Sequence, residues 1–331
     1  MTTAAADPLA PLADLPGVPA AVAAARRQVD RLYGHRVMRR RADEVTAESV
    51  LRGARASAAL DGADWPLEEI RRRTDFGADA EARRVGGALR VTAESGQLLS
   101  SWRHSPLQVL ARLHLLAAGE GARSAAGAGG APADAGVGRP RRAAERPEEL
   151  FPLALAATEP LEPAAGGAGV AADDAGEAGG AGEAGRTGAA GGIPTAPPAE
   201  EVSARLDGLA RLLVARVERK SPTTAAPALV AAAVVHGELL TLRPFASHNG
   251  VVARAAQRIV LISEGLDPKG ICPAEVGLVE LGTDAYRRAL AGYASGTAEG
   301  MAAWIAHCAR ALELGMREST AVCEAMQRGM A

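Results

Sequence analysis

The segment 243–254, RPFASHNGVVAR, contains the residue types of this chain that are best suited to phosphate chemistry. Small or polar residues lead into an apolar stretch with helical character: Ser247, His248, Asn249 and Gly250. The free backbone N–H groups at a helix start form an anion-binding position. Arg254 follows about one turn later and could add a positive charge. Two interpretations stay open on these grounds: a phosphate-binding loop, or a capped core helix whose Arg254 pairs with a carboxylate.

The stretch 250–264 is predicted to be a helix that is apolar on nearly every side and is therefore buried. Its polar residues fall on one stripe: Arg254, Gln257, Arg258 and Glu264. Polar groups on a buried helix need partners or a water-filled cleft. This stripe is therefore expected to face one or the other.

The composition is that of a large chain with nearly balanced charge: 331 residues, a net charge of −2, 48% hydrophobic and only 3% aromatic residues. Such a balance predicts neither a nucleic-acid nor a membrane partner. The basic runs at 39–41 and 138–142 lack interleaved aromatic residues, so they are expected to be solvated. Three cysteines without a CxxC pair argue against a disulfide framework. No signal peptide or membrane span is evident, so a cytoplasmic protein is expected.

Helical periodicity dominates the remainder of the chain and predicts a mostly α fold. Helices are expected near 20–33, 46–60, 66–73, 78–97, 106–117, 197–218, 227–240, 250–264, 282–294 and 298–327. Thr46 is the expected N-cap of the second of these helices. The chain shows no βαβ alternation, no GxGxxG and no GxxxxGK[ST], so a Rossmann or P-loop fold is not indicated.

Low-complexity sequence separates these elements. Residues 1–17 are rich in Ala and Pro, and a disordered N-terminal tail is expected there. Two stretches, at about 118–140 and 159–192, contain few large apolar residues and cannot offset their ordering entropy, so they are predicted to be disordered insertions. The rest, 18–328, is predicted to form one helical domain, with a short extended element between the insertions.

Two further histidines have simpler explanations than catalysis. His236 lies on an apolar helix and is expected to be a core histidine with a hydrogen-bond partner. His307 and Cys308 are adjacent, so they point apart on a helix, and no second pair at ligand spacing accompanies them. No zinc site is expected.

The motif segment resembles the Fic (Fic/Doc, or Fido) family, whose signature runs His-x-Phe-x-Asp/Glu-Gly-Asn-Gly-Arg-x-x-Arg. The matching residues are Pro244, Phe245, Asn249, Gly250 and Arg254. SAALDG, which comprises Ser57 to Gly62, is similar to the inhibitory motif of that family, with Asp61 in place of Glu. The segments 106–114 and 138–139 are similar to the family's helix and flap. The stretch 285–312, with Tyr286 and Trp304, is similar to the helices after the motif.

The resemblance implies a helical Fic fold with a short β-hairpin flap, related to enzymes that transfer AMP from ATP to a hydroxyl group of a target. It also identifies losses. The family's general base is His, but Arg243 stands here and cannot accept a proton near neutral pH. The acidic Mg²⁺ ligand is Ser247, the first motif Gly is His248, and the first motif Arg is Val251. Together these departures argue against ordinary AMP transfer.

The inhibitory-like residues Ser57, Asp61 and Gly62 imply one contact. In the family the inhibitory Glu pairs with the second motif Arg, which is Arg254 here. We therefore expect the side chains of Asp61 and Arg254 to meet. Because the catalytic residues are missing, such a pair would anchor the second predicted helix, 46–60, to the helix predicted over 250–264.

Three hypotheses for function follow. The first is a pseudoenzyme that acts by binding a protein partner. The second is a protein that binds a nucleotide such as ATP, or another phosphate compound, through Asn249, Gly250 and Arg254 together with Ser247 and His248. The third is a transferase with altered chemistry, in which His248 could act as a displaced base. No cofactor is certain, and Mg²⁺ lacks its acidic ligand. Dimerisation stays open.

Overall fold

The computed structural model describes residues 7–119, 136–158, 192–218 and 225–329. Every regular element within these ranges is helical and none is a strand, which confirms the mostly α fold. The first half contains α1 (Ala10–Ala13), α2 (Val18–Tyr33), the 3₁₀ helix η1 (Arg36–Arg39), α3 (Ala42–Leu60), α4 (Leu67–Arg72), α5 (Ala80–Glu94), α6 (Leu99–His104) and α7 (Pro106–Ala118). The second half contains α9 (Ala199–Glu218), α10 (Ala228–Leu242), α11 (Asn249–Ser263), α12 (Ala274–Leu281), α13 (Thr283–Ser295) and α14 (Ala298–Gln327).

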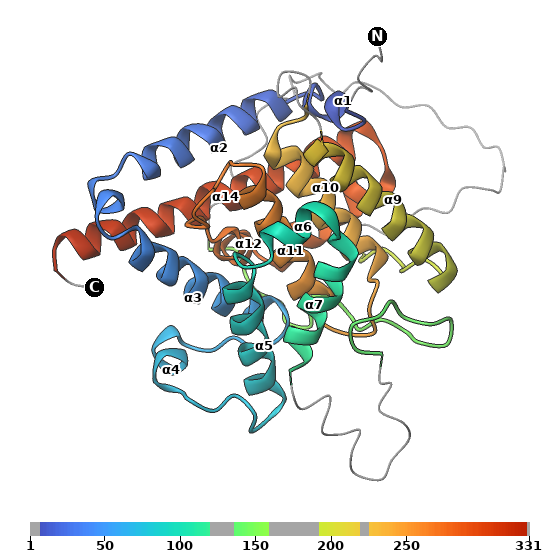
Figure 1. Cartoon of the computed structure of the whole chain (residues 1–331), viewed down its shortest axis with the longest axis horizontal. Coiled ribbons are helices and arrows are strands. Elements are labelled where there is room, and N and C mark those ends of the chain that lie inside the picture. The colour runs from blue at the N-terminus through green and yellow to red at the C-terminus, as the bar shows by residue number, and fades with distance from the viewer. Residues whose placement is uncertain (1–6, 120–135, 159–191, 219–224, 330–331) are drawn as a thin grey trace, which may run out of the picture.

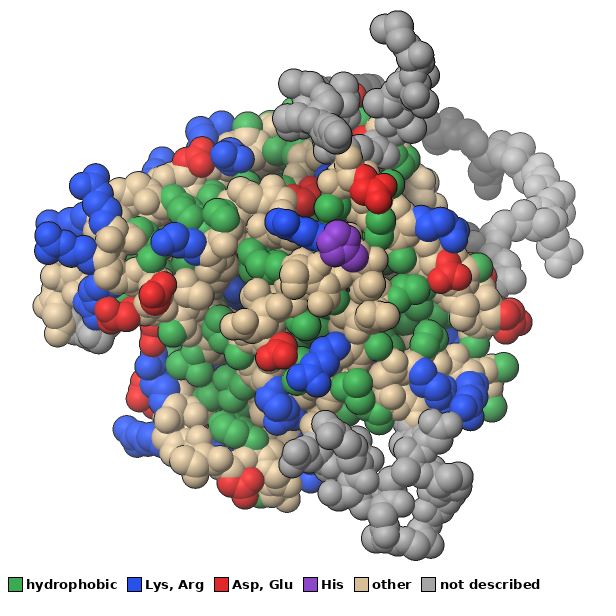
Figure 2. All heavy atoms as spheres, viewed as in Figure 1, with side chains coloured by type: hydrophobic (Ala, Val, Ile, Leu, Met, Phe, Trp, Pro, Cys, Tyr) green, Lys and Arg blue, Asp and Glu red, His purple; other side chains and the backbone are tan. Residues whose placement is uncertain are grey.

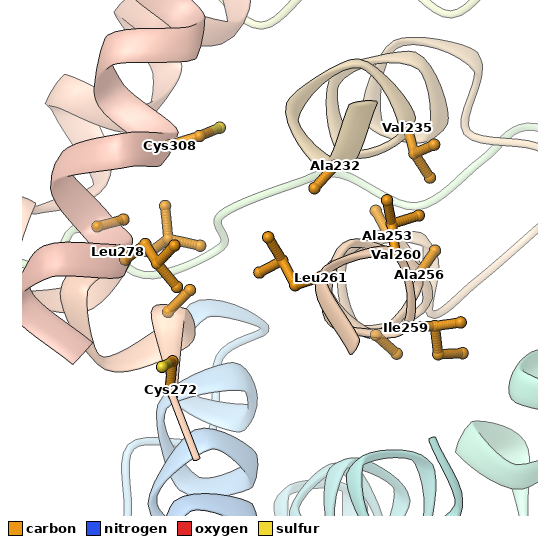
Figure 3. Close-up of a cluster of buried hydrophobic side chains, with 14 of the residues drawn as sticks. Ala232, Val235, Ala253, Ala256, Ile259, Val260, Leu261, Cys272, Leu278 and Cys308 are labelled. Carbon is orange, nitrogen blue, oxygen red and sulfur yellow. The ribbon is translucent and has the colours of Figure 1, made fainter. Parts of the chain in front are cut away.

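Helices α10 and α11 form the centre of the molecule (Figure 1). Both are buried along nearly their whole length, so other helices must surround them. Figure 3 shows side chains of α10, α11, α12 and α14 that meet in the core, among them Ala232, Ile259, Leu278 and Cys308. Many of these side chains are small, which lets the helices approach closely. The loop 243–248 between α10 and α11 is thereby held inside the molecule.

The surrounding helices complete the core. Helix α2 runs beside the long C-terminal helix α14 (Figure 1), and α3 packs against α5, α11 and α12. Helix α7 contacts α5 and α11. The end of α3 and the start of α11 are therefore brought together, which is the arrangement that the motif needs.

Several element boundaries differ from the prediction. Helix α3 begins at Ala42, so Thr46 lies inside it and donates its hydroxyl hydrogen to the carbonyl oxygen of Lys269 (3.1 Å) instead of capping the helix. Helices α6 and α12 were not predicted, because six and eight residues are too short for a clear period. The segment 136–158 contains no strand and no hairpin.

The predicted disordered segments have different outcomes. The expected tail 1–17 is wrong from Asp7 onward, because α1 forms there and the Asp7 side chain is buried. The Asp7 carboxylate pairs with Arg216 and accepts the backbone N–H of Ala226 at 2.9 Å. The two predicted insertions lie largely outside the described residues.

The surface carries charges of both signs. On the face shown in Figure 2, basic and acidic side chains are interspersed. In the basic run 39–41, Arg39 and Arg40 are exposed and Arg41 pairs with Glu44, as expected for solvated residues. Among the described helices, none is both long and apolar enough to cross a bilayer.

Candidate functional site

The loop between α10 and α11 is a tight internal turn. Two non-glycine residues in it, Arg243 (φ 42°) and His248 (φ 60°), adopt left-handed backbone conformations. The side chain of Asn249 fixes the turn: its Oδ1 accepts the N–H of Phe245 (2.9 Å), and its Nδ2 donates to the carbonyl oxygen of the same residue (2.8 Å). The amide of Asn249 is therefore used inside the loop, which differs from its predicted role in ligand binding.

The segment 136–151 covers this loop. The N–H of Arg141 donates to the carbonyl oxygen of Pro244 (2.7 Å), and the N–H of Glu148 donates to that of Ala246 (2.9 Å). His114, on α7, supports the loop from another direction by stacking on the Phe245 ring, with a centroid separation of 4.2 Å. The loop is thus held between α7 and a segment that is more than 90 residues earlier in the sequence.

The anion-binding position at the start of α11 is occupied by a carboxylate of the protein. Oε1 of Glu148 accepts the backbone N–H of Asn249 at 3.0 Å. Burial raises the pKa of Glu148 to about 7, and the nearby charge of Asp61 adds to this, although the backbone N–H groups of Asn249 and His248 favour the ionised form. Sequence reasoning missed Glu148, because no local pattern links it to a loop 101 residues away.

Arg254 is buried, and its Nε and Nη2 atoms bind to groups at the end of α3. Its Nη2 lies 2.8 Å from Oδ2 of Asp61, so the predicted ion pair is confirmed. Its Nε donates to the Ser57 hydroxyl (2.8 Å), and Nη2 also donates to the Ser57 carbonyl oxygen (3.0 Å). Gly250 leaves room for this pair, since a Cβ there would overlap Oδ1 of Asp61. Gly62 (φ 97°) turns the chain after α3.

The remaining polar stripe of α11 also finds partners within the protein. Arg258 pairs with Glu275 (3.0 Å) and donates to the carbonyl oxygen of Gly270 (3.0 Å). Glu264 pairs with Arg216 at 2.6 Å. Gln257 differs, because its buried Nε2 has no hydrogen-bond partner within the described ranges. The stripe mainly joins α11 to its neighbours, as the interpretation of a capped core helix expects.

The ring nitrogens of His248 and His236 contact hydroxyl groups of other residues. Nδ1 of His248 lies 2.8 Å from the Ser247 hydroxyl, and burial lowers the pKa of His248. His236 lies in the core, as predicted, with its Nε2 2.5 Å from the Tyr286 hydroxyl oxygen. Over the described ranges, no three His, Cys, Asp or Glu side chains are placed to hold a metal ion.

Arg243 stands at the position where the Fic signature has its catalytic His. Its side chain contacts a different part of the chain from those that Glu148 and Arg254 contact. Its Nη2 donates to the carbonyl oxygen of Pro194, and its side chain lines a cavity with the segments 141–149 and 192–198. Burial lowers the pKa of Arg243, and the positive charge of Arg141 adds to that effect. The predicted site residues therefore divide between two places.

Comparison with known proteins identifies the fold. No protein-family profile and no curated protein matches the chain. Among solved structures, the chain is similar to a Fic family protein from Desulfovibrio desulfuricans G20, with a TM-score of 0.57 and 18% sequence identity. The match covers 91% of this chain and 74% of the other. This chain has the Fic fold. At 18% identity the likeness concerns the fold alone.

ATP and Mg²⁺, which the Fic resemblance implies, do not fit the residues as arranged. A phosphate group at the start of α11 would meet the carboxylate of Glu148 on the Asn249 N–H, and that of Asp61 on Arg254. Like charges at such close range repel. Ser247 offers only a neutral hydroxyl, which already contacts His248. Two acidic side chains of the protein therefore contact the groups at the start of α11 that could bind a phosphate.

Proposed function

We propose that this chain is a pseudoenzyme with the Fic fold, which does not transfer AMP and acts by binding another protein. The observation that supports the proposal best is that two carboxylates of the protein bind to α11 at the groups a phosphate would need. Glu148 accepts the backbone N–H at the start of α11, and Asp61 pairs with Arg254. These are the two groups that a phosphate would use.

The chemistry of the loop supports the same conclusion. Transfer to a hydroxyl group needs a general base, and the guanidinium of Arg243 cannot accept a proton. His248 is half-buried and contacts Ser247, five positions away from the base of the motif. An enzyme built on this loop would have to replace the base and the metal ligand and also displace two carboxylates.

A second candidate is a phosphate-binding protein that uses the same loop after Glu148 moves away. Two observations favour it. The pKa of Glu148 is raised to about 7 by burial and by the charge of Asp61, so its ionised form is disfavoured. Nη1 of Arg254 is buried without a hydrogen-bond partner among the described residues. In this case binding would require an opening of the segment 136–151.

The experiment that tests AMP transfer uses the full chain with labelled ATP, Mg²⁺ or Mn²⁺, and a set of protein targets. We expect no label on the chain or on any target, both for the natural sequence and for the double variant Asp61→Ala/Glu148→Gln. Label that appears with the natural sequence and disappears in Arg254→Ala would contradict the proposal.

A second measurement distinguishes the phosphate-binding protein from the pseudoenzyme. Thermal unfolding is followed with ATP, ADP, CTP and GTP, where a ligand at a hundredfold over its Kd should add about 2.7 kcal/mol. We expect no shift for the natural chain. A shift that appears in Glu148→Gln and is lost on addition of Arg254→Ala would favour the phosphate-binding protein.

The partner is tested by reconstitution. The tagged chain is purified from its source cells, and any co-purifying protein is produced separately and mixed with it again. The proposal expects a defined complex between the two purified proteins in size-exclusion chromatography. If every co-purifying protein fails to rebind, the proposed mode of action is wrong.

A further inference from the structure

The cavity beside Arg243, of about 990 Å³, lies between the segments 141–149 and 192–198. Four basic side chains line it: Arg141, Arg146, Arg243 and Arg287. The acidic side chains in the lining are Glu145 and Glu149, and Glu145 already pairs with Arg139 at 2.6 Å. The wall of the cavity therefore has an excess of positive charge.

Two of these guanidinium groups are buried without a compensating carboxylate. Arg141 is 7% exposed and Arg243 is 8% exposed. Within the described part of the chain, their side chains donate only to carbonyl oxygens: Arg141 donates to those of Arg243 (2.9 Å) and Pro197, and Arg243 donates to that of Pro194. Neither takes part in an ion pair within the described ranges. Burial of a charge without a partner costs free energy, and a bound counter-ion reduces that cost.

Two residues that line this cavity also have N–H donors that are not used in hydrogen bonds to the described residues. The Nε atoms of Arg243 and Arg287 are both buried without a hydrogen-bond partner in the described part of the chain. The left-handed backbone of Arg243 is a conformation that Gly and Asn adopt more easily, so local sterics do not explain an arginine there. Charge, burial and unused donors all indicate an anionic ligand.

We propose that this cavity binds a phosphate monoester. A dianionic phosphate would balance the two uncompensated guanidinium groups, and its oxygens match the planar donor fork of arginine. The volume lies within the range of pockets that enclose small ligands. This inference does not rest on the proposed function, because it involves neither Glu148 nor Arg254.

The ester could belong to a small molecule or to a phosphorylated side chain of a protein, and the experiment distinguishes these sources. Isothermal titration calorimetry is performed at fixed ionic strength with three probes. They are glycerol phosphate, a capped phosphoserine peptide, and dimethyl phosphate, which is a monoanionic diester. We expect at least one monoester to bind at least tenfold more tightly than the diester. The tighter of the two monoesters identifies the source.

Arg243→Asn is the test variant, because Asn suits the left-handed backbone while the guanidinium is removed. We expect its affinity for the monoester to fall at least tenfold, with a melting temperature in the absence of ligand that is unchanged or higher. Arg26→Gln is the control, since Arg26 is exposed and does not line the cavity, and the affinity of this variant for the monoester should not change. Arg146→Gln, at an exposed residue of the cavity lining, provides a second variant that should fold normally and bind more weakly.

The inference is overturned if neither monoester binds the natural chain, or if Arg243→Asn and Arg146→Gln both bind as tightly as the natural chain. The proposed function can fail separately. Detection of AMP transfer would refute the pseudoenzyme and leave phosphate binding in this cavity unaffected.

Discussion

At the residue scale, Asp61 and Glu148 both place a carboxylate where a phosphate would be expected. Asp61 neutralises Arg254, whose side chain is only 1% exposed, and Glu148 accepts the N–H of Asn249. The two carboxylates affect the stability of the fold in different ways. An ion pair that loses one partner leaves a buried charge, whereas a buried carboxylate near another acid is itself disfavoured.

The first prediction concerns the ion pair. Asp61→Ala leaves the buried guanidinium of Arg254 without its paired carboxylate, so we expect a loss of about 3 kcal/mol in the free energy of unfolding, measured in urea. Adding Arg254→Met should cost less than the sum of the single variants. Asp30→Ala is the control, because its pair with Arg26 is exposed and should contribute less than about 1 kcal/mol. A change below about 0.5 kcal/mol in Asp61→Ala would show that the pair is unimportant.

The second prediction concerns pH. The pKa of Glu148 is raised from 4.5 to about 7, so the folded state holds more protons than the unfolded state between these values. Its contribution to stability is therefore complete below about pH 4.5 and is lost as the pH rises through 7. Glu148→Gln should be more stable than the natural chain at pH 8, by about 2–3 kcal/mol, and about equally stable at pH 4. An equal difference at both pH values in urea unfolding would contradict this assignment.

At the element scale, the α3–α11 contact is decisive for the site. Arg254 and Arg258, one turn apart on α11, both reach α3, where they contact Ser57 and Ser49. Small residues make this approach possible: a Cβ at Gly53 would overlap the Arg258 guanidinium. The polar stripe of a buried helix thus acts as a set of fixed connections between helices.

The third prediction tests this close approach. Gly250→Ala improves helix propensity, but its methyl group would overlap Oδ1 of Asp61 and lie 2.9 Å from Nη1 of Arg254. We expect a net loss of about 2 kcal/mol in the free energy of unfolding, because the ion pair must open. Gly96→Ala is the control, since no atom lies within 4 Å of a Cβ at that position. If thermal unfolding gives equal melting temperatures for the two variants, the close approach has no energetic importance.

At the scale of the whole molecule, residues from the start of the described chain join the centre. Arg216 of α9 pairs with both Asp7 and Glu264, so the N-terminal segment, α9 and the end of α11 meet at one buried guanidinium. The exposed fraction of the Asp7 side chain is 0%. The segment before α2 is therefore part of the fold.

The fourth prediction is that Asp7→Ala destabilises the whole domain. It leaves the Ala226 N–H without its acceptor and Arg216 with one carboxylate, so a loss of about 2–3 kcal/mol is expected. Asp14→Ala, at an exposed position seven residues later, should change the free energy of unfolding by less than about 0.5 kcal/mol. The check is urea unfolding of both variants, and equal midpoints would mean that the segment only rests on the surface.

The sequence by itself determined the helical class, the buried character of α11 and its polar stripe, because these properties follow from local periodicity. Together with the Fic resemblance it also predicted the pair between Asp61 and Arg254. Short helices such as α6 and α12 were missed, since a few residues do not define a period.

Only the tertiary structure decided what occupies the motif. Glu148 lies 101 residues before Asn249, and Asp7 lies 219 residues before Ala226, so no spacing rule connects them. The cavity around Arg243 likewise combines residues from four parts of the chain: 141–149, 192–198, Arg243 and Arg287. Such contacts depend on how packed helices place loops against one another, and side-chain types along a single segment do not contain that information.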